Sequence, residues 1–152
     1  MQSLTPQFDK CHPQVSLPAC VAPVEQFPLY GYKVTAGFPS PADDYVEDLL
    51  DLNQLLVKNK PATFFLRVKG NSMIGAGIHD DDIVVCDRSL EPVDRSIVVA
   101  VLDGELTIKR LVFANGKTQL VAENPDFPAI TMKDGQELTC WGVVTSAVHS
   151  VK

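Results

Sequence analysis

From residue 63 onward the chain is a series of short β-forming runs separated by turn residues. Runs of this length rich in Val, Ile, Thr and Phe are typical of strands, and Asp-Gly or Asn-Gly between two of them predicts a hairpin turn. Asp103-Gly104 and Asn115-Gly116 are two such turns. The pattern predicts a mainly β, compact antiparallel domain with strands at 63–69, 82–87, 96–102, 105–113, 117–122 and 138–149.

Residues 1–41 hold seven of the chain's eleven prolines and predict a different structure. Proline fixes φ and lacks an N–H group, so this spacing excludes a long helix, a central strand and a helix-turn-helix motif. We expect an extended arm whose apolar residues, from Val21 to Val34, dock on the domain as an edge segment.

One or two helices are predicted between the arm and the first strand. Ser40-Pro41 followed by acidic residues is a favourable helix start, and apolar residues recur at near-helical spacing through about Lys58. Asp51 is an equally suitable cap for a second short helix, so the sequence is compatible with one helix or with two. We expect the apolar stripe to pack into the core.

Composition and charge exclude several classes of protein. The net charge is −6, and the sequence shows no cluster of Lys and Arg of the kind that binds a phosphate backbone, which argues against direct, strong nucleic-acid binding. No apolar run approaches the roughly 18 residues of a membrane span, and no secretory signal is visible, so we expect a cytoplasmic protein. Its four cysteines are then expected to stay reduced, with Cys86 and Cys140 as small core residues.

Ser72 and Lys109 are the candidate reactive pair. Gly70 ends the predicted strand and leaves Ser72 at a turn beside a rigid strand. Alternation along the strand at 105–113 puts Thr107 and Lys109 on one face. Taken alone, a serine after a glycine is usually a turn residue, and a strand lysine usually points at water. A serine nucleophile needs a base, which Lys109 supplies if its face lines a site beside Ser72.

Histidine is the alternative base. A Ser-His-Asp triad is less favoured than the lysine, because two of the three histidines lie near the termini and the third lies in an acidic loop: His12, His149 and His79. No metal or other cofactor is predicted. A possible zinc set near the N-terminus fits no standard spacing and lacks a fourth ligand: Cys11, His12 and Cys20.

Three motifs at matching separations resemble the LexA/UmuD family of self-cleaving serine peptidases. They are Gly70-Asn71-Ser72-Met73, Lys109 37 positions after the serine, and Ala36-Gly37 36 positions before it. The stretches 36–42 and 51–56 are similar to the UmuD branch in particular. The resemblance implies a fold of the LexA C-terminal type. It also implies that residues 1–36 are an extended Pro-rich arm removed on self-cleavage and that residues 37–152 are a Ser/Lys peptidase-like domain.

The same resemblance implies that Ser72 cuts the bond between Ala36 and Gly37 with Lys109 as its base. Lys109 accepts a proton only when neutral, and burial among apolar groups lowers a lysine pKa from its ordinary value of about 10.4. Backbone N–H groups near the serine are candidates for stabilising the oxyanion, and one side chain is a candidate for orienting the amine, although it is equally well explained as a strand former. The backbone candidate is Asn71, next to Ser72, and the side-chain candidate is Thr107.

UmuD-like identity further implies partners. Cleavage is expected to be stimulated by a RecA filament on single-stranded DNA, and the shortened homodimer is expected to join an error-prone Y-family translesion polymerase in SOS mutagenesis. One alternative is a non-enzymatic adaptor with a vestigial dyad. A second is a LexA-like repressor, which the Pro-rich arm and the acidic charge oppose. A third is a signal peptidase, but the proline usual after the Ser-Met pair of that family is absent here.

Overall fold

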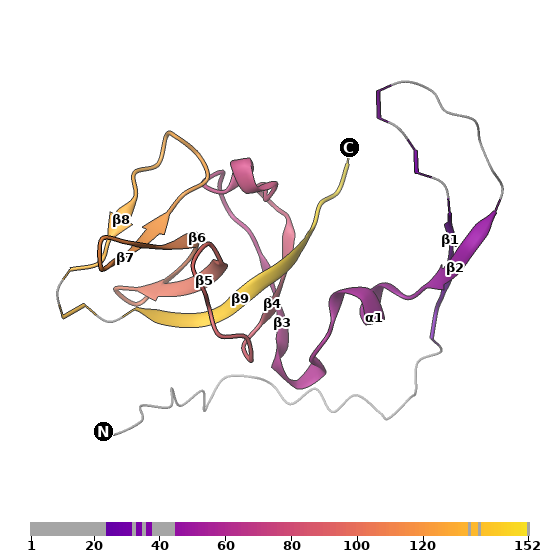
Figure 1. Ribbon diagram of the computed structural model, residues 1–152, viewed down its shortest axis with the longest axis horizontal. Coiled ribbons are helices and arrows are strands. Elements are labelled where there is room, and N and C mark those ends of the chain that lie inside the picture. The colour runs from indigo at the N-terminus through magenta and orange to yellow at the C-terminus, as the bar shows by residue number, and fades with distance from the viewer. Residues whose placement is uncertain are drawn as a thin grey trace.

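The computed structural model describes residues 24–31, 33–34, 36–37, 45–133, 135–136 and 138–151. Figure 1 shows a curled main sheet and a slender two-stranded segment that projects from it. The main sheet has seven strands in the order β3-β4-β9-β5-β6-β7-β8, and the second sheet consists of β1 and β2. The strands are β1 (Phe27–Tyr30), β2 (Val46–Leu50), β3 (Thr63–Arg67), β4 (Ile83–Asp87), β5 (Ile97–Leu102), β6 (Glu105–Ala114), β7 (Lys117–Val121), β8 (Ile130–Thr131) and β9 (Thr139–Val148). The helices are α1 (Leu52–Leu56) and two short 3-10 helices, η1 (Lys60–Ala62) and η2 (Ile74–Ala76).

All strand pairs of the main sheet are antiparallel, which confirms the predicted fold class. Each of the six predicted strands is present, with its ends within two residues of the predicted ones. The sequence did not predict β8, because a strand of two residues has no periodicity to detect.

The two predicted hairpin turns join β5 to β6 and β6 to β7. All four central residues have positive φ: 50° for Asp103, 84° for Gly104, 52° for Asn115 and 70° for Gly116. A tight turn with positive φ at both central residues matches the twist of its flanking strands, and asparagine, aspartate and glycine tolerate that conformation best. Together the turns set the register of β6, the strand that carries Thr107 and Lys109.

The core consists of two clusters of buried side chains. The first includes Met73, Val84, Cys86 and Val99, and the second centres on Leu111 and its neighbours. Cys86 is fully buried, as predicted, and burial raises the pKa of its thiol to about 11. Half-buried Cys140 packs against the second cluster, and both cysteines are free.

The segment ahead of the main sheet corrects part of the helix prediction. Val46–Leu50 forms β2, which pairs antiparallel with β1. The predicted helix is therefore wrong over these residues, because a strand of the arm supplies a ladder that local periodicity does not reveal. The expected start at Ser40-Pro41 lies outside the described residues. The arm's described strand joins β2 rather than the edge of the main sheet, so the expected docking on the domain is not found there.

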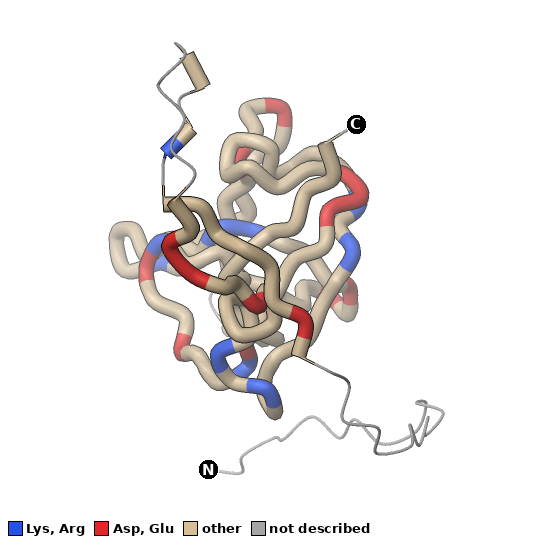
Figure 2. Tube along the Cα trace, turned by 90° about the vertical axis from the view of Figure 1, so that its right-hand side faces the viewer, with Lys and Arg blue, Asp and Glu red and all other residues tan. Residues whose placement is uncertain are grey.

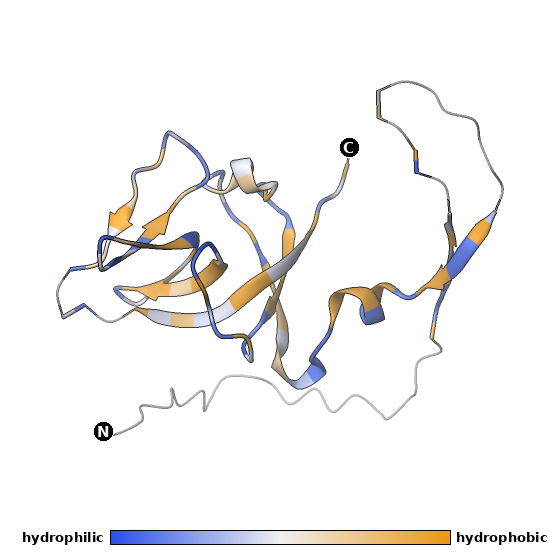
Figure 3. Cartoon of the chain, viewed as in Figure 1, coloured by the Kyte–Doolittle hydropathy of each residue, from blue (hydrophilic) through white to orange (hydrophobic). Residues whose placement is uncertain are grey.

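The short helix α1 is the second of the two helical alternatives. The Asp51 side chain accepts a hydrogen bond of 2.8 Å from the Asn53 N–H and caps it. Leu49, Leu52 and Leu55 are 54 %, 56 % and 48 % exposed, so the expectation that this stripe packs into the core is wrong for them. Figure 3 shows hydrophobic colouring along α1 and part of β2, in the segment that lies beside the main sheet.

Charged residues are interspersed along the described chain. In Figure 2 the Lys and Arg residues are scattered among Asp and Glu, with no single basic stretch. This distribution agrees with the net charge of −6 and gives no support to a phosphate-binding face among these residues. Within the described ranges, no helix has the length and apolar character needed to cross a membrane.

Candidate active site

Ser72 lies in the turn that follows β3. The turn begins at Gly70, whose φ of +91° favours glycine, and the Gly70 N–H donates to the Asp80 carboxylate. The next residue after the serine, Met73, is only 2 % exposed and packs in the first core cluster. The turn is therefore fixed at both ends, which holds half-buried Ser72 in place.

A second loop braces the Ser72 turn from the far side. The Glu123 N–H donates to the Ser72 carbonyl at 2.9 Å, and the Asn124 side chain donates to the Asn71 carbonyl at 2.9 Å. Gly75 donates to the Glu123 carbonyl at 2.7 Å, and a Cβ at Gly75 would lie 2.6 Å from that oxygen. Arg110 on β6 binds the Glu123 carboxylate. Only glycine allows this close approach of the two loops.

Lys109 reaches the serine from β6. The residue is 8 % exposed, and its Nζ lies 3.0 Å from Ser72 Oγ, 3.1 Å from Thr107 Oγ1 and 3.0 Å from the Ile108 carbonyl oxygen. None of the ion pairs found among the described residues includes this amine. Desolvation by burial lowers the pKa of Lys109, because the charged form loses its hydration without gaining a carboxylate partner.

A cavity of about 250 Å³ opens beside the serine. Residues 66–70, from β3 and its end, line one side, and Leu106, Thr107 and Ile108 of β6 line the other. β3 is an edge strand of the main sheet, since it pairs only with β4. An edge strand beside a cleft can accept an extended segment as an added strand.

Ala36 and Gly37 are not in this cavity. They are exposed in the loop between β1 and β2, and a Cβ added at Gly37 would meet nothing within 4 Å. In Figure 1 the described residues of this connection lie beyond β1 and β2, away from the main sheet. The structure thus brings Ser72, Lys109 and Thr107 into contact and leaves Ala36 and Gly37 outside.

Comparison with known proteins identifies the family. The Peptidase S24-like family model matches residues 28–145. The chain belongs to the Peptidase S24-like family. Protein SamA from Salmonella typhimurium is 41 % identical over 125 residues, which cover 82 % of this chain and 86 % of SamA. Protein MucA from Escherichia coli is 42 % identical over 126 residues, covering 82 % and 86 % of the two chains. The LexA repressor from Cupriavidus necator is 35 % identical over 137 residues, covering 90 % of this chain and 62 % of the repressor.

The S24-like match confirms the predicted membership in the LexA/UmuD family, which consists of self-cleaving serine peptidases. Similarity to MucA and SamA places the chain in the UmuD-like branch, which belongs to SOS mutagenesis. The match also disfavours the signal-peptidase alternative, because the family model covers most of the chain.

The backbone N–H groups of Asn71 and Ser72 donate no hydrogen bond to any described residue. The carbonyl groups of both residues, in contrast, accept the bonds from the bracing loop. The Asn71 carbonyl belongs to the same peptide group as the Ser72 N–H, so its bond from Asn124 holds that donor in position. Unused donors at a serine turn are the feature that an oxyanion site requires.

Sequence reasoning missed two features of the site region. The bracing loop at Glu123 and Asn124 carries no motif, and its role depends on contacts between residues about 50 positions apart. His79 and His149 do not bind Ser72 but meet at Asp82, across 67 residues of sequence. No local pattern predicts either contact. Cys11, His12 and Cys20, which the sequence analysis did not favour as a zinc site, lie outside the described residues.

Proposed function

We propose that this protein cleaves its own chain between Ala36 and Gly37, with Ser72 as nucleophile and Lys109 as general base. The observation that carries the proposal is the distance of 3.0 Å between Lys109 Nζ and Ser72 Oγ, made by a lysine that is 8 % exposed. A nucleophile and its base must lie within hydrogen-bonding reach, and a third group must orient the base. The distance of 3.1 Å from Lys109 Nζ to Thr107 Oγ1 supports Thr107 as that third group.

The three contacts of the Lys109 amine fit the charged form, which donates three N–H groups, and they also accommodate the neutral form that the reaction needs. A neutral amine has two N–H groups and one lone pair. Thr107 Oγ1 and the Ile108 carbonyl oxygen accept the two N–H groups, which directs the lone pair toward the Ser72 hydroxyl. In this state the serine donates to the lysine, and the lysine is ready to take the proton. The lowered pKa of Lys109 increases the neutral fraction near neutral pH.

The covalent steps follow from this arrangement. Ser72 Oγ attacks the Ala36 carbonyl carbon while its proton passes to Lys109, and the oxyanion is stabilised by the free N–H groups of Asn71 and Ser72. The peptide C–N bond breaks as Lys109 returns the proton to the Gly37 amine. Water then hydrolyses the ester between Ala36 and Ser72. The products are residues 1–36 and a chain of 116 residues.

Cleavage requires the loop between β1 and β2 to enter the cavity. Ala36 and Gly37 are small and exposed, so their movement breaks few contacts. A tethered substrate compensates for a simple dyad, because well-oriented intramolecular groups reach effective concentrations of about 10⁵–10⁸ M. We propose that the loop adds to the free edge of β3 when it docks.

The wider role follows from the UmuD-like relationship. We propose that a RecA filament on single-stranded DNA promotes this docking, and that the shortened homodimer serves as accessory subunit of a Y-family translesion polymerase in the cytoplasm. Similarity to MucA and SamA supports the role in SOS mutagenesis. The acidic net charge is compatible with it, since the partners would contact the DNA.

The test is the intact mass of the purified protein after incubation near pH 7 and near pH 10, with Ser72→Ala as the control. The proposal predicts one break, between Ala36 and Gly37, that is faster at high pH and absent in the variant. Addition of a RecA filament near pH 7 should accelerate the same break. A stable wild type under all these conditions would instead support the adaptor with a vestigial dyad, and a break elsewhere would refute the assigned substrate.

A further inference from the structure

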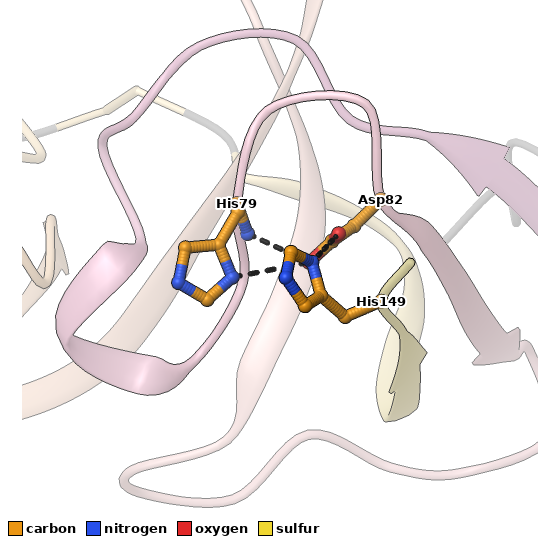
Figure 4. Close-up of side chains that lie close together, drawn as sticks. All are labelled: His79, Asp82 and His149. Carbon is orange, nitrogen blue, oxygen red and sulfur yellow. Dashed lines mark hydrogen bonds and ion pairs between the residues drawn. The ribbon is translucent and has the colours of Figure 1, made fainter. Parts of the chain in front are cut away.

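Two histidines and a buried aspartate meet beside the start of β4 and the end of β9 (Figure 4). Asp82 precedes β4 and its side chain is 3 % exposed, His79 lies three residues earlier, and His149 follows the end of β9. His149 Nδ1 lies 2.6 Å from Asp82 Oδ1, and His79 Nδ1 lies 3.5 Å from Asp82 Oδ2. The two imidazole rings are 4.6 Å apart.

The cluster brings together the ligand atoms that a metal ion uses. Both histidines direct Nδ1 toward the same carboxylate, and the three ligand atoms lie within 4.8 Å of one another. The His79 backbone N–H donates to Asp82 Oδ2 at 2.8 Å, which orients the carboxylate from behind. Such a second hydrogen bond is the usual way in which a ligating group is held in place. No Lys or Arg forms an ion pair with Asp82 in the described part of the chain.

We propose that His79, Asp82 and His149 bind one divalent transition-metal ion of the Zn²⁺ type. Imidazole nitrogen and carboxylate oxygen are ligands that Zn²⁺ accepts, and three protein ligands leave a fourth position for water. Mg²⁺ and Ca²⁺ prefer sites made of oxygen alone, so the two nitrogen ligands disfavour them. Nothing in the proposed peptidase chemistry uses this cluster.

Metal binding requires a rearrangement, because His79 Nδ1 faces Asp82 Oδ2 whereas His149 Nδ1 faces Oδ1, and the three ligand atoms lie within 4.8 Å of one another. With metal–ligand bonds of about 2.0–2.1 Å, the ligand atoms of a tetrahedral site are about 3.3 Å apart. His79 Nδ1 and Asp82 Oδ2 already have that separation within a few tenths of an ångström. His149 Nδ1 is too close to Asp82 Oδ1 and moves outward by less than an ångström when the ion replaces the shared proton. Its side chain is 47 % exposed, so it has room to move.

The surroundings attract cations. A cavity of about 500 Å³ lies at the cluster and is lined by Asp80, Asp81, Asp82 and His149 among others. Arg67 also lines this cavity but is paired with Asp81 at 2.8 Å, so the remaining carboxylates give the cavity a negative charge. This cavity provides a route from solvent to Asp82 and His149.

A bound ion would join two distant parts of the chain. Val68 and the Asp81–Asp82 turn exchange backbone hydrogen bonds of 2.8 and 2.9 Å just before the Ser72 turn. The ion would link the end of β9, through His149, to the Asp81–Asp82 turn. We therefore expect it to stabilise the fold and to leave the Ser72–Lys109 contact unchanged.

The test measures metal binding by the full-length chain after treatment with a chelator. Because Cys11, His12 and Cys20 offer competing ligands, the parent protein carries C11S, H12A and C20S. Titration with Zn²⁺ should give one ion per chain, and Zn²⁺ should raise the thermal midpoint. Co²⁺ should give the visible bands of a four-coordinate site without the near-ultraviolet band of a thiolate ligand.

Variants then assign the ligands. His149→Ala and His79→Ala should each lower the Zn²⁺ affinity by more than the roughly 10- to 100-fold lost when an outer hydrogen-bond partner is removed, and should abolish the thermal shift. Ser150→Ala, beside His149, should leave both unchanged. The proposal is overturned if the parent protein binds no Zn²⁺ at 100 μM, or if His149→Ala binds it as tightly as the parent. Circular dichroism of each variant verifies that it is folded.

Discussion

The proposed catalytic pair and the proposed scissile bond lie in opposite environments. Lys109 is 8 % exposed, its amine has three hydrogen-bond partners, and the turn that carries Ser72 is braced by a second loop. Ala36 and Gly37 are exposed in a loop that extends from a two-stranded sheet whose residues are themselves largely exposed. The region of Ser72 and Lys109 is held in place by packing against the core, whereas Ala36 and Gly37 are exposed to solvent.

This difference indicates where the reaction is controlled. A chain that held its scissile bond in the cavity from the start would cut itself as it folded. Here the proposed nucleophile and base are in contact and the proposed scissile bond lies outside the cavity, so we infer that docking of the loop, rather than assembly of the dyad, is the step on which the proposed partner acts. The following experiments perturb one region at a time.

The largest effect is expected at the base. Lys109→Met should reduce the rate of cleavage by about 10²–10⁴-fold, the usual contribution of a general base. The matched control is Lys117→Met, since Lys117 is an exposed lysine at the start of β7. Quantification of the two products by mass spectrometry near pH 10 gives the rates. Equal rates for the two variants would show that the lysine is not the base.

The next effect concerns the substrate alone. Ala36→Phe places a bulky side chain in a cavity of about 250 Å³ and should slow cleavage by about 10- to 100-fold, equivalent to 1–3 kcal/mol of overpacking. Because Ala36 is exposed, the thermal midpoint should not change. A lower thermal midpoint with an unchanged cleavage rate would show that Ala36 packs in the folded protein and does not enter the cavity during cleavage.

Gly75→Ala disturbs the contact between the Ser72 turn and the bracing loop at Glu123 and Asn124. The new Cβ would lie 2.6 Å from the Glu123 carbonyl oxygen, so one of the two loops must shift. We expect a loss of about 1–3 kcal/mol in the free energy of unfolding, measured by urea denaturation, together with slower cleavage. Unchanged cleavage despite the loss of stability would mean that the brace does not position Ser72.

The smallest effect is expected at the orienting residue. Thr107→Val removes one acceptor for the Lys109 amine, a hydrogen bond worth about 0.5–1.5 kcal/mol, and should slow cleavage by about 3- to 10-fold. Thr139→Val, at an exposed position on β9, is the control. If the two variants cleave at the same rate, Thr107 is a strand former and has no role in orienting the amine.

The sequence predicted the main sheet well, because alternation and the two hairpin turns are local signals that determine strand ends. It also predicted that Thr107 and Lys109 share a face of β6, and the hydrogen bond between them agrees. The geometric contact of Lys109 with Ser72 needed the fold as well, since it depends on how β3 and β6 curl around one cavity.

Other features could not be predicted, because they depend on partners distant in sequence. Val46–Leu50 has near-helical spacing but becomes a strand when Phe27–Tyr30 pairs with it. The contact of His149 with Asp82 joins residues whose neighbours in sequence give no indication of a common site. The roles of Ser72 and Lys109 stay predictions until cleavage is measured.

The central claim is that burial makes Lys109 a base, and the rate of cleavage measured from about pH 6 to pH 11 tests it most directly. A lowered pKa means that the amine loses its proton at a lower pH than a free lysine. The rate should therefore rise tenfold per pH unit at low pH and reach a plateau at high pH. The pH at which the rate is half-maximal should lie below the ordinary lysine pKa of about 10.4. A flat profile, or a rise that continues through pH 10.4 without levelling, would contradict the account.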